Sequence, residues 1–208
     1  MKIAVFVSGG GTNLQAIIDN IKNGYLSGIE ITLVLASNKD AYALTRAADN
    51  GIPSCVMSSK DYASKEEWDT AVLNKVNESG AELIVLAGYL SLLGPQLVKA
   101  YANRIINIHP ALIPSFCGAG MYGIKPHKAV LARGVKVSGA TVHFVNENYD
   151  EGPIILQKAV DVLPDDTAET LQQRIMKECE QVILPRAIRL IADGKVTIEN
   201  NIAYVKEA

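Results

Sequence analysis

Asn107 and His109 stand two residues apart in the segment Asn107-Ile108-His109-Pro110. The apolar run at 104–108 predicts a buried strand. Side chains alternate along a strand, so positions 107 and 109 lie on the same side of it. An amide N–H can stabilise an oxyanion while a neighbouring imidazole moves protons, and acyl transfer needs both. A core histidine satisfied by a backbone carbonyl would give the same pattern, and this alternative stays open.

Asp150 is the carboxylate that we expect to pair with His109. It lies in a Tyr-Asp-Glu-Gly-Pro segment between two strand-like runs. A turn between strands can aim an acid at a cleft, and the Gly-Pro pair that follows directs the chain. The alternative is a solvent-facing turn aspartate without a catalytic role.

The remaining histidines and cysteines form no metal-binding or nucleophile pattern. His127 follows a proline at a predicted helix start, and His143 lies within an apolar strand and is interpreted as structural. No pair among the three histidines has zinc-ligand spacing. Cys117 lies in a glycine-rich loop without a sequence-adjacent base, so we interpret it as a small loop residue. We therefore expect a site without a metal.

The second chemical feature is the run Ser-Gly-Gly-Gly-Thr-Asn at 8–13, between the first strand and the first helix. Outward-pointing amides and the positive helix N-terminus attract an anion, and glycine admits it close to the backbone. A dinucleotide fingerprint would need glycine where Leu14 stands and an acid near 36–39, where the chain reads Ala-Ser-Asn-Lys. No lysine follows the glycines as a P-loop requires. A phosphate monoester is the expected anion, and a tight turn without a ligand is the alternative.

The elements that must position these residues alternate along the chain. Short apolar runs predict strands at 2–7, 29–36, 54–57, 83–87 and 104–108. Helical periodicity between them predicts an α/β fold with a Rossmann-like, mostly parallel sheet flanked by helices. An antiparallel C-terminal part is predicted from the runs at 136–145, 153–160, 196–199 and 202–205. A long helix through residue 192, kinked at Pro185, precedes the last two runs.

Composition limits the classes of protein that this chain can be. Its 208 residues are 49% hydrophobic and 20% charged, enough for a core, and no linker or repeat interrupts them, so we expect one domain over 1–208. A net charge of −2 gives no bulk field for nucleic acid or an anionic membrane. Three scattered cysteines are typical of reduced thiols, and the apolar stretch at 83–93 is shorter than the ~20 residues of a membrane helix. We expect a cytoplasmic protein.

Three motifs, in this order, resemble those of the phosphoribosylglycinamide formyltransferase family. They are Ser-Gly-Gly-Gly-Thr-Asn at 8–13, Asn-Ile-His-Pro-Ala-Leu-Ile-Pro at 107–114, and Val-His-Phe-Val at 142–145 followed by Asp-Glu-Gly-Pro-Ile-Ile at 150–155. The likeness extends over nearly the whole chain. It implies transfer of a formyl group from the co-substrate 10-formyltetrahydrofolate to the amine of glycinamide ribonucleotide, in purine synthesis.

The resemblance also implies roles for individual residues. The catalytic trio would be Asn107, His109 and Asp150. The ribonucleotide would be bound by the glycine loop and the long helix, through Gly11, Thr12, Asn13, Lys177 and Glu180. Folate would be bound by Lys65, Leu90, Ser91, Leu92, Leu93, Asn107, Asn146, Glu147, Asn148 and Tyr149. The implied partners are these small molecules, without nucleic acid or membrane, and the implied state is a monomer or a weak homodimer.

Rival functions remain at this stage. A methionyl-tRNA formyltransferase would carry a further C-terminal domain and a formyltetrahydrofolate deformylase a further N-terminal one, and we expect neither in this chain. The methionyl-tRNA formyltransferase would share the Asn-x-His…Asp chemistry, and the deformylase is a formyltetrahydrofolate hydrolase, which stays open as an alternative function. A non-enzymatic phosphate-binding module would use the glycine loop and leave Asn107, His109 and Asp150 without a role.

Overall fold

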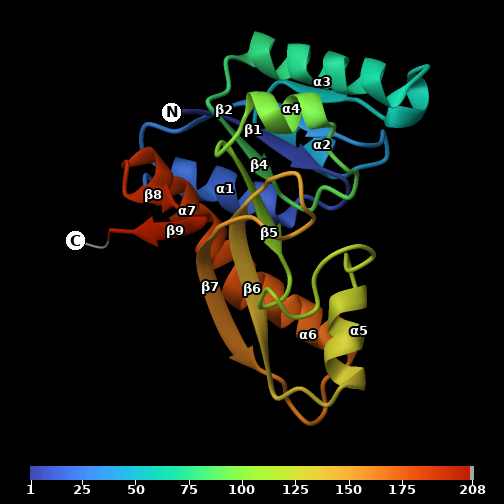
Figure 1. Cartoon of the computed structure of the whole chain (residues 1–208), viewed down its shortest axis with the longest axis vertical. Helices are drawn as coiled ribbons and strands as arrows, with labels where there is room; N and C mark the ends of the chain where they lie inside the picture. The colour runs from blue at the N-terminus through green and yellow to red at the C-terminus, as the bar shows by residue number, and fades with distance from the viewer. Residues whose placement is uncertain (207–208) are drawn as a thin grey trace. The chain divides into compact units, whose positions relative to one another are not determined.

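A strand with five successive buried residues opens the chain in the computed structural model, which describes residues 1–206 (Figure 1). This strand, β1 (Lys2–Val7), is apolar after Lys2, as expected of a strand covered on both faces. The chain forms two compact units, Met1–Ile106 and Asn107–Ala208.

Parallel strands form the centre of the first unit. β1 pairs in parallel with both β2 (Glu30–Ala36) and β4 (Leu83–Leu86), and β2 pairs with β3 (Ser54–Val56), in the order β3-β2-β1-β4. The last strand here is β5 (Ile105–His109), which begins in the first unit and ends in the second. The predicted parallel part of the fold is confirmed, and it directs the carboxyl ends of β1, β2 and β4 to one edge.

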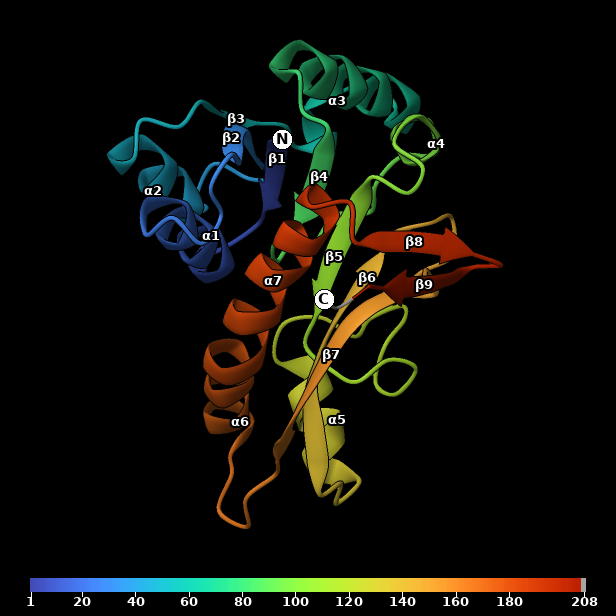
Figure 2. The same ribbon diagram turned by 90° about the vertical axis from the view of Figure 1, so that its left-hand side faces the viewer.

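Helices connect these strands. α1 (Thr12–Lys22) and α2 (Ala43–Asp49) lie on one face of the strands, and α3 (Lys65–Ser79) and α4 (Pro95–Ala100) lie on the other (Figure 2). A single 3₁₀ turn, η1 (Ser59–Asp61), precedes α3. This two-sided cover follows from right-handed crossovers on either side of β1. Within residues 1–206, none of the helices is both long enough and apolar enough to span a membrane.

α4 is a helix that the sequence analysis missed. It has six residues, and its start is capped by the buried Asp69 carboxylate of α3, which accepts the amide protons of Gln96 and Leu97 at 2.8 and 3.2 Å. A Cβ at Gly94 would lie 1.9 Å from the Asp69 Cγ, so this approach requires glycine. The cap therefore comes from a residue distant in sequence rather than from the usual neighbouring Ser, Thr or Asp.

The second unit contains the predicted antiparallel part. β6 (Val137–Phe144) and β7 (Ile154–Asp161) pair antiparallel, and α5 (Lys125–Ala132) precedes them. The hairpin of β8 (Val196–Glu199) and β9 (Ile202–Val205) turns at two asparagines with φ of 51° and 61°, as a type I′ turn requires. These predictions are confirmed.

The predicted long helix is present but not uniform. α6 (Ala168–Ile175) begins at the cap Thr167 and continues through a π-helical turn, η2 (Met176–Glu180), into α7 (Gln181–Ala192) (Figure 2). The irregular turn thus precedes Pro185, where the sequence predicted a kink. A proline ring crowds the carbonyl four residues before it, and the wider turn lies directly N-terminal to that carbonyl.

Candidate functional site

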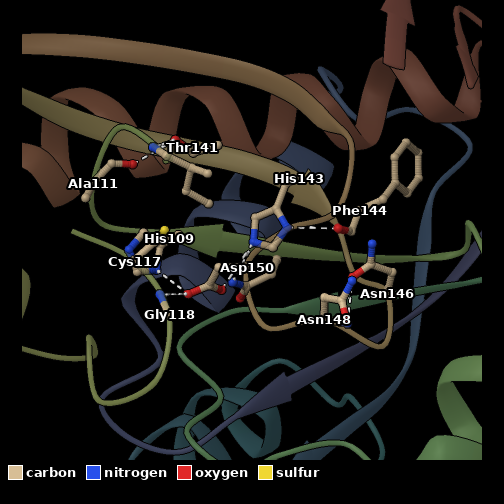
Figure 3. A network of polar contacts seen from close by, with 12 residues as sticks. His109, Ala111, Cys117, Gly118, Thr141, His143, Phe144, Asn146, Asn148 and Asp150 are labelled. Carbon is tan, nitrogen blue, oxygen red and sulfur yellow. Dashed lines mark hydrogen bonds and ion pairs between the residues drawn. The ribbon is translucent and has the colours of Figure 1, made fainter. Parts of the chain in front are cut away.

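His109 ends β5 with a side chain only 5% exposed. Its Nε2 lies 2.9 Å from the carbonyl oxygen of Phe116 (Figure 3 shows the surrounding network). A carbonyl can only accept, so Nε2 carries a proton and donates it. Nδ1 then faces the Asp150 carboxylate, whose Oδ2 is 3.7 Å away. A second proton on Nδ1 would complete an ion pair with Asp150.

The Asp150 side chain is buried beside His109 rather than exposed to solvent on its turn. Its side chain is 7% exposed, and its Oδ2 accepts the backbone N–H of Gly118 at 2.8 Å (Figure 3). Its φ of 56° is left-handed, a strained conformation for a residue with a side chain. The surface-turn alternative is therefore wrong for Asp150, and its predicted pairing with His109 is present.

The segment after His109 is anchored to β6. The buried Thr141 hydroxyl donates to the carbonyl of Ala111 at 2.7 Å and accepts the N–H of Ile113 at 3.1 Å. These bonds fix the start of the loop that carries the Phe116 carbonyl and the Gly118 amide. The backbone of one loop thus contacts both His109 and Asp150.

His143 belongs to the same network, which the sequence analysis did not foresee. Its Nδ1 lies 2.8 Å from the Phe144 carbonyl, and its Nε2 lies 3.6 Å from Oδ1 of Asp150 (Figure 3). The same Nε2 lies 3.1 Å from Nδ2 of Asn107. Its structural interpretation was incomplete, because strand alternation identifies the side on which a residue lies and not its partner. The one signal in the sequence was the position of His143 in the apolar strand that directly precedes the turn carrying Asp150.

Burial shapes the electrostatics of this network. Desolvation is the main cause that lowers the pKa of His143, so the ring is neutral and its unprotonated Nε2 can accept from Asn107. Desolvation and the nearby Asp150 both raise the pKa of Cys117, which keeps this thiol protonated. Its Sγ donates to the carbonyl of Pro114 at 3.2 Å, in agreement with the interpretation of Cys117 as a loop residue rather than a nucleophile.

Asn107, His109 and Asp150 therefore stand together within the second unit as predicted. The arrangement offers an amide donor, an imidazole that can carry two protons and a carboxylate that stabilises its charged form. These are the groups needed to stabilise a tetrahedral oxyanion and to move a proton. Within residues 1–206, no cluster of three His, Cys, Asp or Glu side chains could hold a metal ion.

The glycine loop lies in the first unit, between β1 and α1. Gly9 and Gly10 are exposed, and a Cβ built on either would meet nothing within 4 Å. Thr12 and Asn13 form the first turn of α1. This part of the loop is open for an anion to approach the backbone.

Gly11 is required to be a glycine by a second feature, in addition to the expected approach of an anion. Its φ is +68°, and an added Cβ would lie 2.6 Å from the Cβ of Ala43 in α2. The neighbouring helix therefore excludes a side chain at Gly11. The sequence analysis did not foresee this contact.

The predicted folate segment after β4 is tied to the same loop. The Ser8 hydroxyl oxygen accepts the N–H of Leu90 at 2.8 Å, and the Ser8 N–H donates to the Gly88 carbonyl at 3.1 Å. Leu90 and Leu92 are 54% and 64% exposed, an apolar surface suited to a flat ring system. Ser91 and Leu93 between and after them are half-buried.

The other predicted binding residues are placed as follows. Lys65 is exposed at the first position of α3, in the first unit. In the second unit, Asn146, Glu147, Asn148 and Tyr149 form the turn that leads into Asp150, with Tyr149 46% exposed. Lys177 and Glu180 both lie on the π turn η2, Lys177 exposed and Glu180 buried. Turns of this kind are often found at functional sites.

Comparisons with known proteins agree over nearly the whole chain. Residues 1–188 match the formyl transferase family. The chain is 38% identical to phosphoribosylglycinamide formyltransferase of Haemophilus influenzae, over 98% of this chain and 93% of that protein. It is 44% identical to trifunctional purine biosynthetic protein adenosine-3 of Gallus gallus, over 95% of this chain, but it spans only 19% of that longer protein.

A solved structure has the same fold. Glycinamide ribonucleotide transformylase 1 from Symbiobacterium toebii is 42% identical, with a TM-score of 0.93 over 100% of this chain and 94% of that one. At this identity the likeness extends beyond the fold to the family.

Proposed function

The chain belongs to the formyl transferase family, and from that premise we propose that it transfers the formyl group of 10-formyltetrahydrofolate to the amine of glycinamide ribonucleotide. The products are formylglycinamide ribonucleotide and tetrahydrofolate. The observation that carries the proposal is the buried His109, which lies between the Phe116 carbonyl and the Asp150 carboxylate with the Asn107 amide on the same strand.

The reaction uses these side chains in sequence. The substrate amine attacks the formyl carbon, and the formyl oxygen becomes an oxyanion that Asn107 and the protonated His109 stabilise by donating hydrogen bonds. The attacking nitrogen loses a proton, and the departing folate nitrogen gains one as its bond to carbon breaks. Asp150 stabilises the charged imidazole and helps relay this proton. No covalent enzyme intermediate forms.

The binding residues follow the same proposal. Gly11, Thr12 and Asn13 hold the phosphate of the ribonucleotide through the start of α1, together with Lys177 and Glu180. Folate is bound by Lys65, Leu90, Ser91, Leu92, Leu93, Asn107, Asn146, Glu147, Asn148 and Tyr149. The exposed leucines are its apolar contacts and Lys65 its contact for an acidic tail.

We further propose that residues 1–208 act as one formyltransferase domain, as a monomer or weak homodimer in the cytoplasm, without nucleic acid or membrane partners. The charge of −2 supports the absence of nucleic acid, because it supplies no basic field. Light scattering of the purified chain tests the oligomeric state.

A formyl-transfer assay with and without the amine substrate tests the function. We expect tetrahydrofolate to form only when glycinamide ribonucleotide is present. Turnover of 10-formyltetrahydrofolate without the amine would identify a hydrolase instead, and no turnover under either condition would identify a binding module. His109→Ala should lower the rate by on the order of 10²–10⁴ with the fold intact, since it removes the acid–base group. Near wild-type turnover of this variant would contradict the role of His109.

A further inference from the structure

Helix α2 binds the glycine loop through the backbone carbonyl groups of the loop. The N–H of Ala43 donates to the Gly9 carbonyl at 3.1 Å, and Nε of Arg46 donates to the Gly10 carbonyl at 2.8 Å. The C=O and N–H of a trans peptide point in opposite directions. Because both carbonyls face α2, the N–H groups of Gly10 and Gly11 face away from it.

The Arg46 side chain is itself fixed by two further contacts. Its Nη1 donates to Oε1 of Gln15 at 3.0 Å, and its guanidinium carbon lies 5.1 Å from the centre of the Tyr42 ring. Gln15 in turn donates from Nε2 to Asp19 at 2.8 Å. The guanidinium therefore connects α1, α2 and the loop in one orientation, because its rigid plane holds Nε and Nη1 at a fixed spacing that the single nitrogen of an ammonium does not provide.

The loop amides form an anion-binding arrangement. Gly11 is left-handed and the helical Thr12 follows it, so that successive N–H groups turn toward one point at the positive end of α1. Among residues 1–206, no acceptor bonds the N–H groups of Gly9, Gly10 or Gly11.

We propose that Arg46 is a positioning residue of this anion site: by holding the Gly10 carbonyl against α2, it presents the Gly11 N–H to the phosphate ester of the amine substrate. The inference rests on the proposed function, which supplies the phosphorylated ligand. The charge-assisted bond also polarises the Gly10–Gly11 peptide and makes its N–H a stronger donor. Arg46 acts through this peptide and does not touch the reacting atoms.

Two variants of Arg46 and one matched control test the proposal. Arg46→Gln removes the charge and the fork of donors, whereas Arg46→Lys keeps the charge alone. Arg104→Gln is the control, because Arg104 also lies over a tyrosine ring, 4.6 Å from that of Tyr101, and also donates to a carbonyl, that of Ala100 at 2.7 Å. KM for glycinamide ribonucleotide, Ki for inorganic phosphate, KM for folate, kcat and Tm are measured for each.

Arg46→Gln should raise the KM for the ribonucleotide and the Ki for phosphate by the same factor, about 10-fold, the lower end expected for a bond to a charged group. The KM for folate and kcat should stay at wild-type values. Arg46→Lys should remain impaired, because a single ammonium nitrogen lacks the fixed spacing by which Nε and Nη1 reach the Gly10 carbonyl and Gln15. If Arg46→Gln unfolds in the assay, Arg46→Lys carries the same comparison.

Three outcomes would overturn the inference. The first is that Arg46→Gln has the same KM for the ribonucleotide and the same Ki for phosphate as Arg104→Gln. The second is wild-type values of both constants in Arg46→Lys, which would leave only a charge effect. The third is an equal rise of KM for both substrates together with a lower Tm, which would leave only a structural role. Each of these presupposes a wild-type enzyme that transfers formyl groups and is inhibited by phosphate. A wild-type chain that does neither refutes the proposed function instead, so the two failures are distinguishable.

Discussion

The imidazole of His143 accepts a hydrogen bond from the Asn107 amide across 3.1 Å, and this contact decides how the amide is turned. Since Nδ1 of the ring donates to the Phe144 carbonyl, Nε2 has only a lone pair to offer. It can therefore bond the NH₂ end of Asn107 and not the carbonyl end. The second N–H of the same NH₂ group is then the donor that the proposed mechanism assigns to the oxyanion.

We predict that His143→Leu lowers kcat by about 10-fold or more, because the Asn107 amide loses the acceptor that orients it. His143→Gln, whose carbonyl can still accept, should lose less. KM for the ribonucleotide should change little, because His143 contacts Asn107 and Asp150 and none of the residues proposed to bind that substrate. Equal kcat for the Leu variant and the wild type, per folded molecule, would show that the contact has no part in turnover.

Asn107→Asp tests the oxyanion donor directly. An ionised carboxylate cannot donate and repels the developing charge, so kcat should fall by on the order of 10²–10³. Placed beside His143, the new carboxylate should also raise the pKa of that ring by charge attraction. Titration of the His143 ring protons by NMR measures the second effect. A variant that has lost thermal stability and binds both substrates poorly, yet keeps its kcat, would mean that Asn107 only secures the loop.

The sequence predicted those parts of the molecule that rest on local patterns. The strand-like runs and the closing hairpin of the runs at 196–199 and 202–205 were found where expected, because burial and turn chemistry act over a few residues. The grouping of Asn107, His109 and Asp150 was also found. Two of these residues lie at the end of β5, and the third follows β6, the strand next to β5 in the sheet.

The remaining features depend on contacts between distant segments. α4 is capped by Asp69, which lies on another helix, 27 residues before Gln96, so its start lacks an adjacent capping side chain and only Pro95 marks it locally. His143 reads as a core residue because only the tertiary structure shows its partner Asn107. The second reason for Gly11 likewise lies in Ala43, which approaches it from α2. In each case the sequence shows the residue but not its neighbour.

A side chain added at Gly10 should affect ribonucleotide binding, whereas one added at Gly11 should affect stability. Gly10→Val places its methyl groups in the open space in front of the loop, and it should raise the KM for the ribonucleotide with little effect on Tm. Gly11→Ala brings a Cβ against Ala43 in a left-handed conformation, and it should lower stability by about 1–3 kcal/mol. Thermal unfolding and substrate titration separate the two effects. Equal ribonucleotide affinity of Gly10→Val and the wild type would place the anion elsewhere.

Ser8→Ala should weaken folate binding more than ribonucleotide binding. The Ser8 hydroxyl accepts the Leu90 N–H at 2.8 Å and contacts the Ser37 hydroxyl at 2.6 Å, so its loss frees the segment that carries Leu90 and Leu92. We expect KM for folate to rise by about 5- to 10-fold, the worth of one hydrogen bond. Ser8→Thr, which keeps the hydroxyl, is the control. A loss confined to the ribonucleotide would assign Ser8 to the anion site instead.

His127 should make the protein less stable as the solution becomes acidic. The ring is fully buried in α5, and neither of its nitrogens has a hydrogen-bond partner among residues 1–206. Desolvation, with a smaller effect of His109, lowers its pKa from 6.5 to about 4. Between these two pH values the unfolded chain takes up a proton that the folded ring refuses. The free energy of unfolding therefore falls as pH falls, by up to about 1.4 kcal/mol per pH unit for this one group.

His127→Leu tests this directly, because it replaces the unpartnered ring with an apolar side chain of similar size. We expect the variant to be more stable than the wild type at neutral pH, by about 1 kcal/mol or more, since two buried nitrogens without partners are removed. Its unfolding free energy should also fall less steeply between pH 6.5 and pH 4. His143, whose pKa is lowered too, leaves a residual slope of the same sign in both proteins. Lys128→Leu, at the next and exposed position of α5, should keep the full wild-type slope. Chemical denaturation across this pH range measures all three proteins, and identical slopes for His127→Leu and the wild type would show that the folded His127 accepts its proton as readily as the unfolded one.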